Sequence, residues 1–296
     1  MADPRTPAVR LAVLGSPIAH SLSPRLHRAA YDVLGLDWAY EAVECAGPEL
    51  PAFVAGLGSG WRGLSLTMPL KRDVLPLLDL LDHTARLAGA ANTLLVERDG
   101  EGAVIRRGAN TDVDGIVRAF RMAGVERSGR AVVLGAGSTA RSAVVALARM
   151  GAREVTVAAR RPEQGRELAP LADELGVALR VAPFDDAVPA LRDADTVIST
   201  LPGDAAATVP LPGALPEVTV LLDVTYAPWP TGIAAAWERA GGRVVPGIDM
   251  LVHQALGQVR LFAHGDDALP LPGEERVLAA MLASVGRDPR TAWTGA

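Results

Sequence analysis

A short apolar run, a glycine-rich turn and an alanine-rich stretch follow one another directly in the middle of the chain. They are Arg130-Ala131-Val132-Val133-Leu134, then Gly135-Ala136-Gly137-Ser138-Thr139-Ala140, then a segment that extends to Met150. This order predicts a buried strand, a tight turn and a helix. In such a unit the glycines let the backbone approach a pyrophosphate, and the helix N-terminus supplies unpaired N–H groups. We therefore expect a dinucleotide-binding turn, with a plain glycine-rich turn as the alternative.

The strand expected after that helix bears on the type of dinucleotide. It spans Glu154 to Ala158 and is followed by Ala159, Arg160 and Arg161. A site for NAD usually has Asp or Glu near the end of this strand, where the carboxylate binds the ribose 2′-hydroxyl. Here that acid is absent, and two arginines occupy the region where a 2′-phosphate would lie. The pattern predicts NADP, and the alternative is a pair of solvated arginines at the start of a helix.

Further strand and helix patterns continue this series toward the C-terminus. Strands are expected at 178–183, 195–200, 218–223 and 243–245, and helices at 232–240, from Gly247 onward, and at 274–284. Thr200 and the stretch 223–228 come at strand ends that face the same crevice as the glycine turn. We expect an α/β fold with a Rossmann-type, doubly wound dinucleotide-binding domain. The two terminal helices are expected to return to the N-terminal part of the chain.

The N-terminal part of the chain indicates a second α/β domain built from βαβ-like units. Strands are expected at 9–14, 38–43, 63–66, 94–97 and 103–106, and helices at 24–34, 49–57, 71–87 and 112–122. Ser23 is expected to cap the first helix, with Pro24 in the first helical position. Ligand-binding groups of α/β sheets lie at the carboxyl ends of strands. Ser21 and Ser23 follow the first strand, and Thr67 and Lys71 follow the third, so we expect a ligand site there.

Lys71 is the only lysine among 29 basic residues. A guanidinium stays protonated at any working pH, whereas an ammonium can be tuned to give up and regain a proton. Asparagine is equally scarce, with only Asn92 and Asn110, and each precedes a threonine. A side-chain amide both donates and accepts hydrogen bonds, which makes it hard to replace in a binding site. Lys71 is therefore a candidate proton-transfer residue, and chance survival of a surface lysine is the alternative.

The composition limits the classes of partner. The 296 residues suffice for one large domain or two of ordinary size, and the net charge of −5 comes without any basic block. We therefore expect neither nucleic acid nor an anionic membrane as a partner. Cys45 is the single cysteine, so neither an internal disulfide framework nor a cysteine-based metal site is expected. No signal peptide or membrane-spanning run is recognised, which predicts a cytoplasmic protein.

In their order and spacing, these motifs resemble those of the shikimate dehydrogenases over nearly the full length of the chain. The stretches that carry the resemblance are 15–24, 63–71, 89–94, 108–115, 223–231 and 247–254. The resemblance implies reversible NADPH-dependent reduction of 3-dehydroshikimate to shikimate, a step in aromatic amino acid biosynthesis. It also implies a substrate domain formed by residues 1–111 and 248–296, an NADP-binding domain formed by 112–247, and a monomer or homodimer.

The same resemblance implies roles for individual residues. Lys71 and Asp112 would be catalytic: Lys71 would move the proton, and Asp112 would bind the same substrate hydroxyl and hold Lys71 in place. Ser21 and Ser23 would bind the substrate carboxylate. Other substrate contacts would come from Thr67, Asn92, Tyr226 and Gln254. Together with the strand-end positions, it implies a cofactor site made of Gly135, Ala136, Gly137, Ser138, Thr139, Ala159, Arg160, Arg161, Thr200 and Gly247.

The chain departs from the family pattern in three places. Ser65-Leu66-Thr67 stands where the family usually has Asn-Val-Thr. Serine can still hydrogen-bond but is shorter than asparagine, so a direct substrate contact is not carried over to position 65. Ala159-Arg160-Arg161 stands in place of Asn-Arg-Thr, which keeps the arginine and adds a second positive charge. Ser138 and Thr139 replace a Gly-Ala pair in the glycine turn.

Several alternatives stay open at this point. Quinate or aminoshikimate dehydrogenation would use the same scaffold, and Ser65 is a candidate for the small pocket change that either would need. A non-catalytic NADP-binding sensor would be indicated by loss of Lys71 or Asp112, and both residues are present. Ser23 and Asp112 each have the alternative role of capping a helix.

Overall fold

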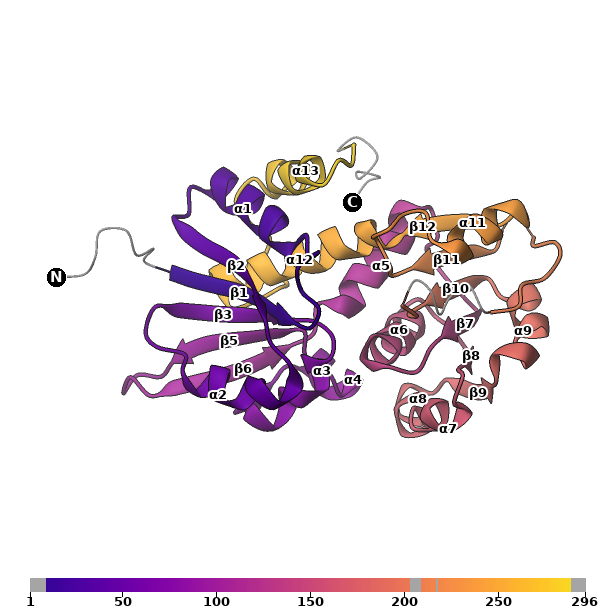
Figure 1. Cartoon of the computed structure of the whole chain (residues 1–296), viewed down its shortest axis with the longest axis horizontal. Helices are drawn as coiled ribbons and strands as arrows, with labels where there is room; N and C mark the ends of the chain where they lie inside the picture. The colour runs from indigo at the N-terminus through magenta and orange to yellow at the C-terminus, as the bar shows by residue number, and fades with distance from the viewer. Residues whose placement is uncertain (1–8, 203–208, 217, 289–296) are drawn as a thin grey trace. The chain divides into compact units, whose positions relative to one another are not determined.

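The computed structural model describes residues 9–202, 209–216 and 218–288. It divides the chain into two compact units, one formed by Met1–Thr111 with Gln254–Ala296 and the other by Asp112–His253. In the structure the chain returns to the first unit after His253, whereas the sequence prediction places this boundary at 247/248, six residues earlier. Each unit contains a six-stranded sheet (Figure 1).

The sheet of the first unit is mixed, with the strand order β2-β1-β3-β5-β6-β4. Its strands are β1 Val9–Gly15, β2 Trp38–Glu44, β3 Trp61–Leu66, β4 Leu80–Leu81, β5 Thr93–Arg98 and β6 Val104–Ala109. β1 pairs in parallel with β2 and β3, whereas β5 runs antiparallel to both β3 and β6. As a result, the amino end of β5 lies at the same edge of the sheet as the carboxyl ends of β1, β3 and β6.

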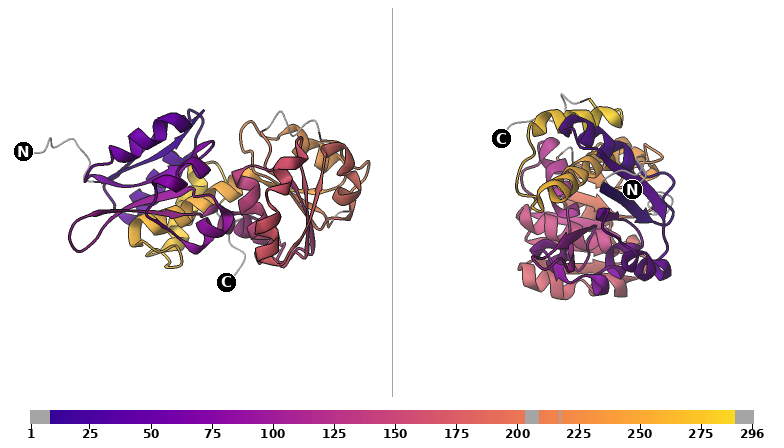
Figure 2. Two further views of the ribbon diagram at one scale, coloured as in Figure 1. Left: turned by 90° about the horizontal axis from the view of Figure 1, so that it is seen from below. Right: turned by 90° about the vertical axis from the view of Figure 1, so that its left-hand side faces the viewer.

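Helices cover both faces of this sheet. On one face, α1 Ser23–Leu34 lies beside α13 Glu274–Ser284 (Figure 2), and the last turns of α12 Gly247–His264 pack on β3. The other face is covered by short helices. These are η1 Gly47–Glu49, α2 Leu50–Ala55, α3 Leu70–Asp73, η2 Leu75–Leu77 and α4 His83–Ala88. The expected return of the C-terminal helices to the first part of the chain is confirmed.

The single long helix expected at 71–87 is wrong. The segment instead contains the four-residue α3, the short η2, the strand β4 and the separate helix α4. Pro76 has no N–H to donate and disfavours helical backbone in the residue before it. β4 pairs in parallel with β6, and the Asp82 carboxylate caps α4 by accepting from the Ala85 N–H at 2.5 Å. Pairing with a distant strand thus overrides the helical spacing of the leucines.

The sheet of the second unit is entirely parallel, with the strand order β12-β11-β10-β7-β8-β9. Its strands are β7 Arg130–Leu134, β8 Glu154–Ala158, β9 Ala178–Ala182, β10 Thr196–Ser199, β11 Val220–Asp223 and β12 Arg243–Pro246. The described helices are α5 Asp112–Met122, α6 Ser138–Arg149, α7 Pro162–Arg166, α8 Ala169–Leu175, η3 Phe184–Asp186, α9 Val188–Asp193 and α11 Gly232–Arg239. Successive strands are added outward from β7 on one side and from β10 on the other. The expected doubly wound order is confirmed, and its switch point lies between β7 and β10.

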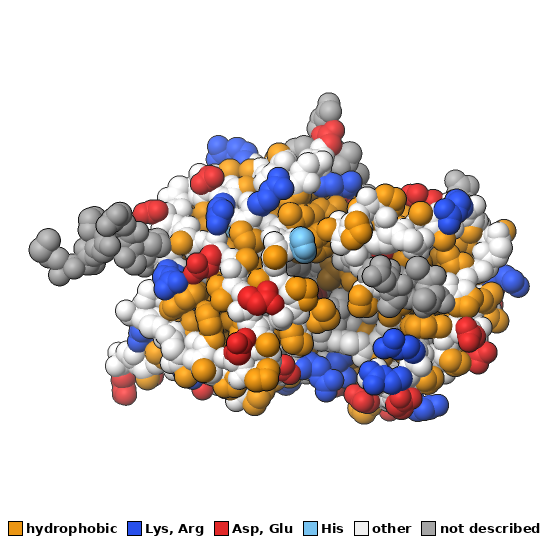
Figure 3. Space-filling view, viewed as in Figure 1, with side chains coloured by type: hydrophobic (Ala, Val, Ile, Leu, Met, Phe, Trp, Pro, Cys, Tyr) orange, Lys and Arg blue, Asp and Glu red, His pale blue; other side chains and the backbone are white. Residues whose placement is uncertain are grey.

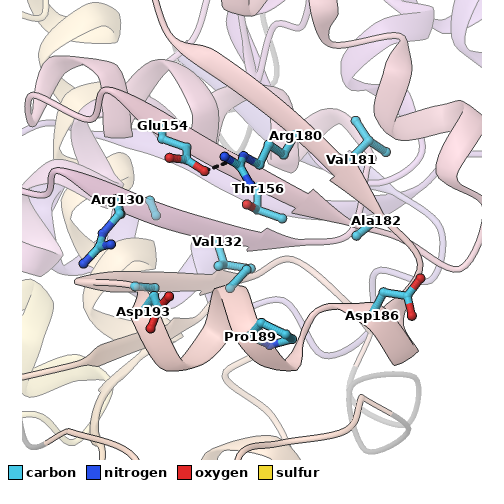
Figure 4. Close-up of a pocket in the computed structure, with 13 residues that line it drawn as sticks. Arg130, Val132, Glu154, Thr156, Arg180, Val181, Ala182, Asp186, Pro189 and Asp193 are labelled. Atoms are coloured by element: carbon cyan, nitrogen blue, oxygen red, sulfur yellow. Dashed lines mark ion pairs between the residues drawn. The ribbon is translucent and has the colours of Figure 1, made fainter.

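One face of the second sheet carries a hollow of about 400 Å³ beside α9 (Figure 4). Alternate residues of β7, β8 and β9 point into it, and charged side chains of both signs, including Arg130, Asp186 and Asp193, line it. The Arg180 guanidinium crosses it to pair with Glu154, with 2.7 Å between Nε and Oε1. The six-residue α9 is too short to cover all three strands. None of the site residues expected from the sequence lines this hollow.

Candidate active site

Two features are absent from the described part of the chain. No helix in residues 9–202, 209–216 or 218–288 combines the length and apolar character that crossing a membrane requires. Within the same ranges, His, Cys, Asp and Glu side chains do not gather in threes as they would to hold a metal ion. The residues expected at the site are described unit by unit.

In the first unit, one edge of the sheet gathers segments that lie far apart in the sequence. The loop with Ser21 and Ser23 follows β1, Thr67 follows β3, and Asn92 directly precedes the antiparallel β5. The Leu66 N–H donates to the Asn92 carbonyl oxygen at 2.7 Å, which joins two of these segments. The mixed topology of the sheet thus places the expected substrate-binding residues of this unit at one edge.

The loop after β1 is held by close contacts at its start. A Cβ atom at Gly15 would lie 2.3 Å from Cγ2 of Thr67 and 2.9 Å from the Met68 carbonyl oxygen, so only glycine allows the two segments to approach this closely. The Glu44 carboxylate at the end of β2 accepts from the Ser16 hydroxyl at 2.5 Å and from the Ile18 N–H at 3.0 Å. These bonds set the path of the loop toward Ser21.

Ser23 does not cap α1, and that prediction is wrong. The N-cap residue is Leu22, which has helical backbone angles and no capping side chain. The Ser23 N–H instead donates to the Ser21 hydroxyl oxygen at 3.3 Å. The Ser23 side chain is buried and hydrogen bonds with Tyr40 of β2. The Ser23 hydroxyl is therefore bonded to a side chain of the sheet and does not cap the N–H groups at the start of α1.

Lys71 lies in the short helix α3, directly beyond the end of β3. Its side chain is only 8% exposed, whereas the neighbouring Arg72 is exposed. The Lys71 carbonyl oxygen accepts from the Ala91 N–H at 2.8 Å, which places α3 against the segment that leads to Asn92. The unique lysine is therefore a buried residue beside the expected substrate ligands, and the alternative of a surface lysine is excluded.

Asn92 is the centre of a buried set of polar contacts. Its Oδ1 accepts from the Thr111 N–H at 2.9 Å and from the Thr93 hydroxyl at 2.9 Å. Its Nδ2 donates to the Thr111 hydroxyl oxygen at 2.8 Å and to Oε1 of Gln254 at 3.2 Å. Asn92 and Gln254, both expected to bind substrate, are thus in direct contact. Asn110 donates from Nδ2 to the Ala90 carbonyl oxygen at 2.8 Å, which is a structural bond.

Three buried polar residues of this unit were not expected from the sequence: His27 of α1, Tyr40 of β2 and Gln258 of α12. The Tyr40 hydroxyl donates to Ser65 at 2.6 Å, and the Ser65 hydroxyl donates to Oε1 of Gln258 at 2.8 Å. Ser65 is 3% exposed, so the residue that departs from the family pattern is used inside the protein. Gln258 follows Gln254 by four residues on the same helix face, which was the one sequence signal for it.

Two residues expected at this site belong to the second unit. Asp112 is the first residue of α5 and is 3% exposed. Tyr226 follows β11 and is partly exposed. The expected contact of Asp112 with Lys71 and that of Tyr226 with substrate stay predictions.

In the second unit, the glycine turn lies at the switch point of the sheet. Gly135 has φ +107°, and a Cβ atom there would lie 2.4 Å from Oγ1 of Thr200. The Thr200 N–H and hydroxyl each donate to the Leu134 carbonyl oxygen at 2.9 Å, so the turn after β7 and the loop after β10 are joined. A Cβ atom at Gly137, in contrast, would meet no atom within 4 Å, which leaves space over the turn for a ligand.

The start of α6 suits a phosphate group. Gly137 is its N-cap residue and, having no side chain, makes no capping hydrogen bond to the first N–H groups of the helix. An uncapped helix N-terminus presents N–H donors and the positive end of the helix dipole to an anion. Ser138 and Thr139 are the first helical residues and are partly exposed. The turn therefore has the shape and the donors that a pyrophosphate requires.

The end of β8 adds positive charge. Ala159 is buried, and its N–H donates to the Ala182 carbonyl oxygen at 3.1 Å. Arg160 and Arg161 are exposed, and Arg161 is the N-cap residue of α7. Among the described residues, neither guanidinium is paired with a carboxylate. Basic side chains are visible in the region of α6 and α7 in Figure 3. The two arginines are therefore available to an anionic group such as a 2′-phosphate.

The end of β11 approaches the start of α12 closely. A Cβ atom at Gly247 would lie 2.5 Å from the carbonyl carbon and oxygen of Val224, so no larger residue fits without displacing the backbone. Burial raises the pKa of the adjacent Asp223 carboxyl, while hydrogen bonds from Thr231 and Thr225 oppose the shift. Gly247 thus allows the first turn of α12 to reach the carboxyl edge of the sheet.

The second unit is doubly wound, with an uncapped glycine turn and two exposed arginines after a strand. The first unit buries the only lysine of the chain at a sheet edge that also carries serine and asparagine side chains. Together they define an α/β oxidoreductase of the NADP-binding class. Comparison with known proteins gives the family. The profile described as "Shikimate dehydrogenase substrate binding domain" matches residues 13–94, and that described as "Shikimate / quinate 5-dehydrogenase" matches residues 119–206. The chain belongs to the shikimate dehydrogenase family.

Individual relatives match over most of their length. A shikimate dehydrogenase (NADP(+)) of Citrifermentans bemidjiense is 39% identical over 286 residues, which cover 93% of this chain and 96% of that protein. The crystal structure of Mycobacterium tuberculosis shikimate dehydrogenase has a TM-score of 0.79 at 43% identity and covers 93% of this chain and 99% of that one. The Thermus thermophilus enzyme, in complex with NADP(H) and shikimate, has a TM-score of 0.77 at 33% identity, with 93% and 99% covered.

Proposed function

We propose that this protein is a shikimate dehydrogenase, which reversibly reduces 3-dehydroshikimate to shikimate with NADPH in aromatic amino acid biosynthesis. The observation that carries the proposal is the buried position of the only lysine, Lys71, at the sheet edge that also holds Ser21, Ser23 and Asn92. All four residues lie within the stretch that matches the family's substrate-binding domain.

Reduction of a ring carbonyl requires a hydride at carbon and a proton at oxygen. NADPH supplies the hydride when bound. Nζ of Lys71 gives the proton to the substrate oxygen as the carbonyl becomes a hydroxyl, and takes it back in the reverse direction. Asp112 accepts a hydrogen bond from the same substrate hydroxyl and holds the ammonium in place. The burial of Lys71 keeps water from competing for this proton.

The remaining residues orient the substrate. Ser21 and Ser23 bind its carboxylate through hydroxyl groups, which suits a charged group at the mouth of the loop. Thr67, Asn92, Tyr226 and Gln254 bind its hydroxyls. Such positioning accounts for a large part of enzymatic rate enhancement, because it converts an encounter into a reaction between fixed groups.

The second unit holds the cofactor. The backbone of Gly135, Ala136 and Gly137 and the N–H groups of Ser138 and Thr139 bind the pyrophosphate. Arg160 and Arg161, supported by the backbone at Ala159, bind the 2′-phosphate. Thr200 closes the turn, and Gly247 would lie beside the nicotinamide ring of the bound cofactor. A cytoplasmic location and a monomeric or homodimeric state stay predictions.

Initial rates with shikimate, quinate and aminoshikimate, each with NADP and with NAD, test this function. We expect turnover of shikimate with NADP and much weaker turnover with NAD. Quinate is the second substrate to examine, because the family matched by residues 119–206 is described by both names. Lack of shikimate turnover in a folded preparation would refute the function, and a preference for NAD would refute the role of the two arginines.

A further inference from the structure

The buried polar residues of the first unit form one continuous hydrogen-bonded chain. It passes from Tyr40 to Ser65, then to Gln258 and Thr93, and ends at Asn92. Residues 65 and 258 are 193 positions apart in the sequence, so this series of hydrogen bonds connects β3 with α12. All five side chains are less than 9% exposed. In such a network the acceptor of each hydrogen, and so the direction of each hydrogen bond, depends on the neighbouring bonds.

Two amide groups in this chain have orientations that the backbone determines. Nε2 of Gln258 lies 3.1 Å from the Asn92 carbonyl oxygen, which accepts hydrogen bonds and cannot donate them. Oδ1 of Asn92 lies 2.9 Å from the Thr111 N–H, which donates and cannot accept. Turning either amide over would bring two acceptors or two donors together. Neither orientation is therefore ambiguous.

The orientation of Gln258 sets the direction of the bonds on one side of it. Its Oε1 accepts only, so the Ser65 hydroxyl must donate to it and must accept in turn from Tyr40. Nε2 of His27 lies 3.3 Å from the same oxygen and must therefore carry the ring proton. Nδ1 of His27 then accepts from the Tyr31 hydroxyl at 3.1 Å. Burial lowers the pKa of His27 to about 3, so the ring stays neutral.

Gln258 also sets the direction of the bonds on the other side. Its Nε2 donates to the Thr93 hydroxyl oxygen at 3.1 Å, so the Thr93 hydrogen is directed to Oδ1 of Asn92. Oδ1 then receives two hydrogen bonds, and Nδ2 is turned toward Gln254 and Thr111. Gln258 therefore contacts the backbone of Asn92 directly and acts on its side chain, the expected substrate ligand, through the Thr93 hydroxyl.

We propose that Gln258 is a positioning residue, which orders the hydrogens of this buried network. Through Thr93 it gives Oδ1 of Asn92 a second hydrogen bond beside that from the Thr111 N–H, and so helps to fix the amide with Nδ2 toward Gln254 for substrate binding. The inference rests on the proposed function in that shikimate is taken as the ligand of Asn92. It also gives Ser65 an internal role: the hydroxyl connects Tyr40 to Gln258 and is not a donor to substrate.

Two substitutions interrupt the series of hydrogen bonds at different residues. Gln258→Glu keeps the size of the side chain but replaces the donor Nε2 with an acceptor, so Thr93 turns its hydrogen toward residue 258 and Asn92 loses a bond. Thr93→Val keeps the shape and removes the hydroxyl that links Gln258 to Asn92. In both variants we expect the KM for shikimate to rise about tenfold or more, with kcat changed far less and the KM for NADP unchanged.

Two further variants separate positioning from simple loss of structure. Thr93→Ser restores the hydroxyl and should restore the wild-type KM for shikimate. Ser128→Ala is the matched control, because it removes a buried hydroxyl bond of 2.6 Å to Thr196 in the second unit, and it should leave both KM values unchanged. If Gln258→Glu does not fold, as judged by circular dichroism, the Thr93→Val and Thr93→Ser pair decides the question.

The His27 ring provides a signature that does not depend on turnover. In the wild type, nitrogen-15 NMR of labelled histidine should show a neutral ring protonated on Nε2. In Gln258→Glu, the group that accepts from Nε2 changes from an amide to a carboxyl group, and the nitrogen-15 shift of Nε2 should change with it. Wild-type shikimate KM in both Gln258→Glu and Thr93→Val would overturn the inference, as would a wild-type ring with its proton on Nδ1. Failure of the wild type to oxidise shikimate would instead refute the proposed function, and the NMR result would still test the order of the hydrogens.

Discussion

The expected ligand sites of the two units are formed by different kinds of group. The first unit uses buried side chains, among them Asn92, Ser65 and Gln258, whose hydrogen bonds are mutual and directional. The second unit uses backbone: a glycine turn with positive φ, an uncapped helix N-terminus and glycines that allow close approach. Its charged side chains, Arg160 and Arg161, are exposed.

This difference has a physical origin. A pyrophosphate is a strong anion that many N–H groups can bind, so its recognition needs donors in a row and space for approach. A small polyhydroxylated acid offers donors and acceptors in a particular arrangement, so its site must present each group in one orientation. We therefore expect single side-chain changes to have larger effects in the first unit than in the second.

The largest effect is expected at Lys71. Lys71→Ala removes the group that moves the proton, and general acid–base help of this kind contributes about 10²–10⁴-fold, so kcat should fall by that factor while shikimate still binds. Lys71→Arg is the sharper test, since it keeps the charge but holds its proton too tightly to transfer it. Steady-state kinetics with shikimate and NADP measure both. Arg72→Ala, at the exposed neighbour, is the control; wild-type kcat in Lys71→Arg would exclude the proton-transfer role.

A smaller effect is expected in the second unit, at the end of β8. Replacing Arg160 and Arg161 together with alanine removes the positive charge expected at the 2′-phosphate. The KM for NADP should rise by about 10²-fold for the pair, with the KM for NAD little changed, because the remaining contacts are to the pyrophosphate. Arg153→Ala changes an exposed arginine at the opposite end of the same strand and should alter neither value. Equal loss of NAD and NADP binding would contradict the assignment.

The smallest effect is expected on the free energy of unfolding, and it comes from His27 of the first unit. Burial lowers the pKa of His27 from 6.5 to about 3, with the Gln258 bond acting in the opposite direction. The unfolded chain therefore binds this proton more tightly than the folded protein. Above pH 6.5 the His27 ring is neutral in both states and does not lower the free energy of unfolding. As the pH falls from 6.5 toward 3, protonation of the unfolded chain lowers that free energy by about 1.4 kcal/mol per pH unit.

Denaturant unfolding of the wild type should accordingly lose about 2 kcal/mol from this group between pH 6.5 and about pH 5. His27→Phe keeps an aromatic ring against Tyr40, on which His27 stacks at 3.9 Å between centroids, and should lack this part of the acid dependence. His83→Gln, at an exposed histidine, is the control and should retain it. An unchanged acid dependence in His27→Phe would show that the buried ring is not its source.

Local patterns in the sequence predicted much of this protein. The strand, turn and helix from 130 to 150, the parallel order of the second sheet and the placement of the serine loop and of Lys71 beyond strand ends are all confirmed. These features depend on residues that are neighbours in the chain. Glycines at a strand end, a proline at a helix start and an isolated lysine can be recognised without knowing what packs against them.

Two expectations failed for the same reason. The leucines between 71 and 87 have helical spacing, but Leu80 and Leu81 pair with β6, which the local pattern does not contain. Ser23 precedes a proline at a helix start, as a capping residue would, but its hydroxyl is directed to Tyr40. In both cases a partner from elsewhere in the chain decided the outcome.

The residues available to the site can be read from the amino-acid sequence: a single lysine, two asparagines, a glycine turn and two arginines after a strand. The orientation of the polar groups, in contrast, follows from the fold. From the sequence, Ser65 is only too short for the contact that an asparagine would make, whereas the fold gives it partners by placing it between Tyr40 and Gln258. The physical reason is that a hydrogen bond has a direction, and that direction depends on which donors and acceptors the fold brings together from distant parts of the chain.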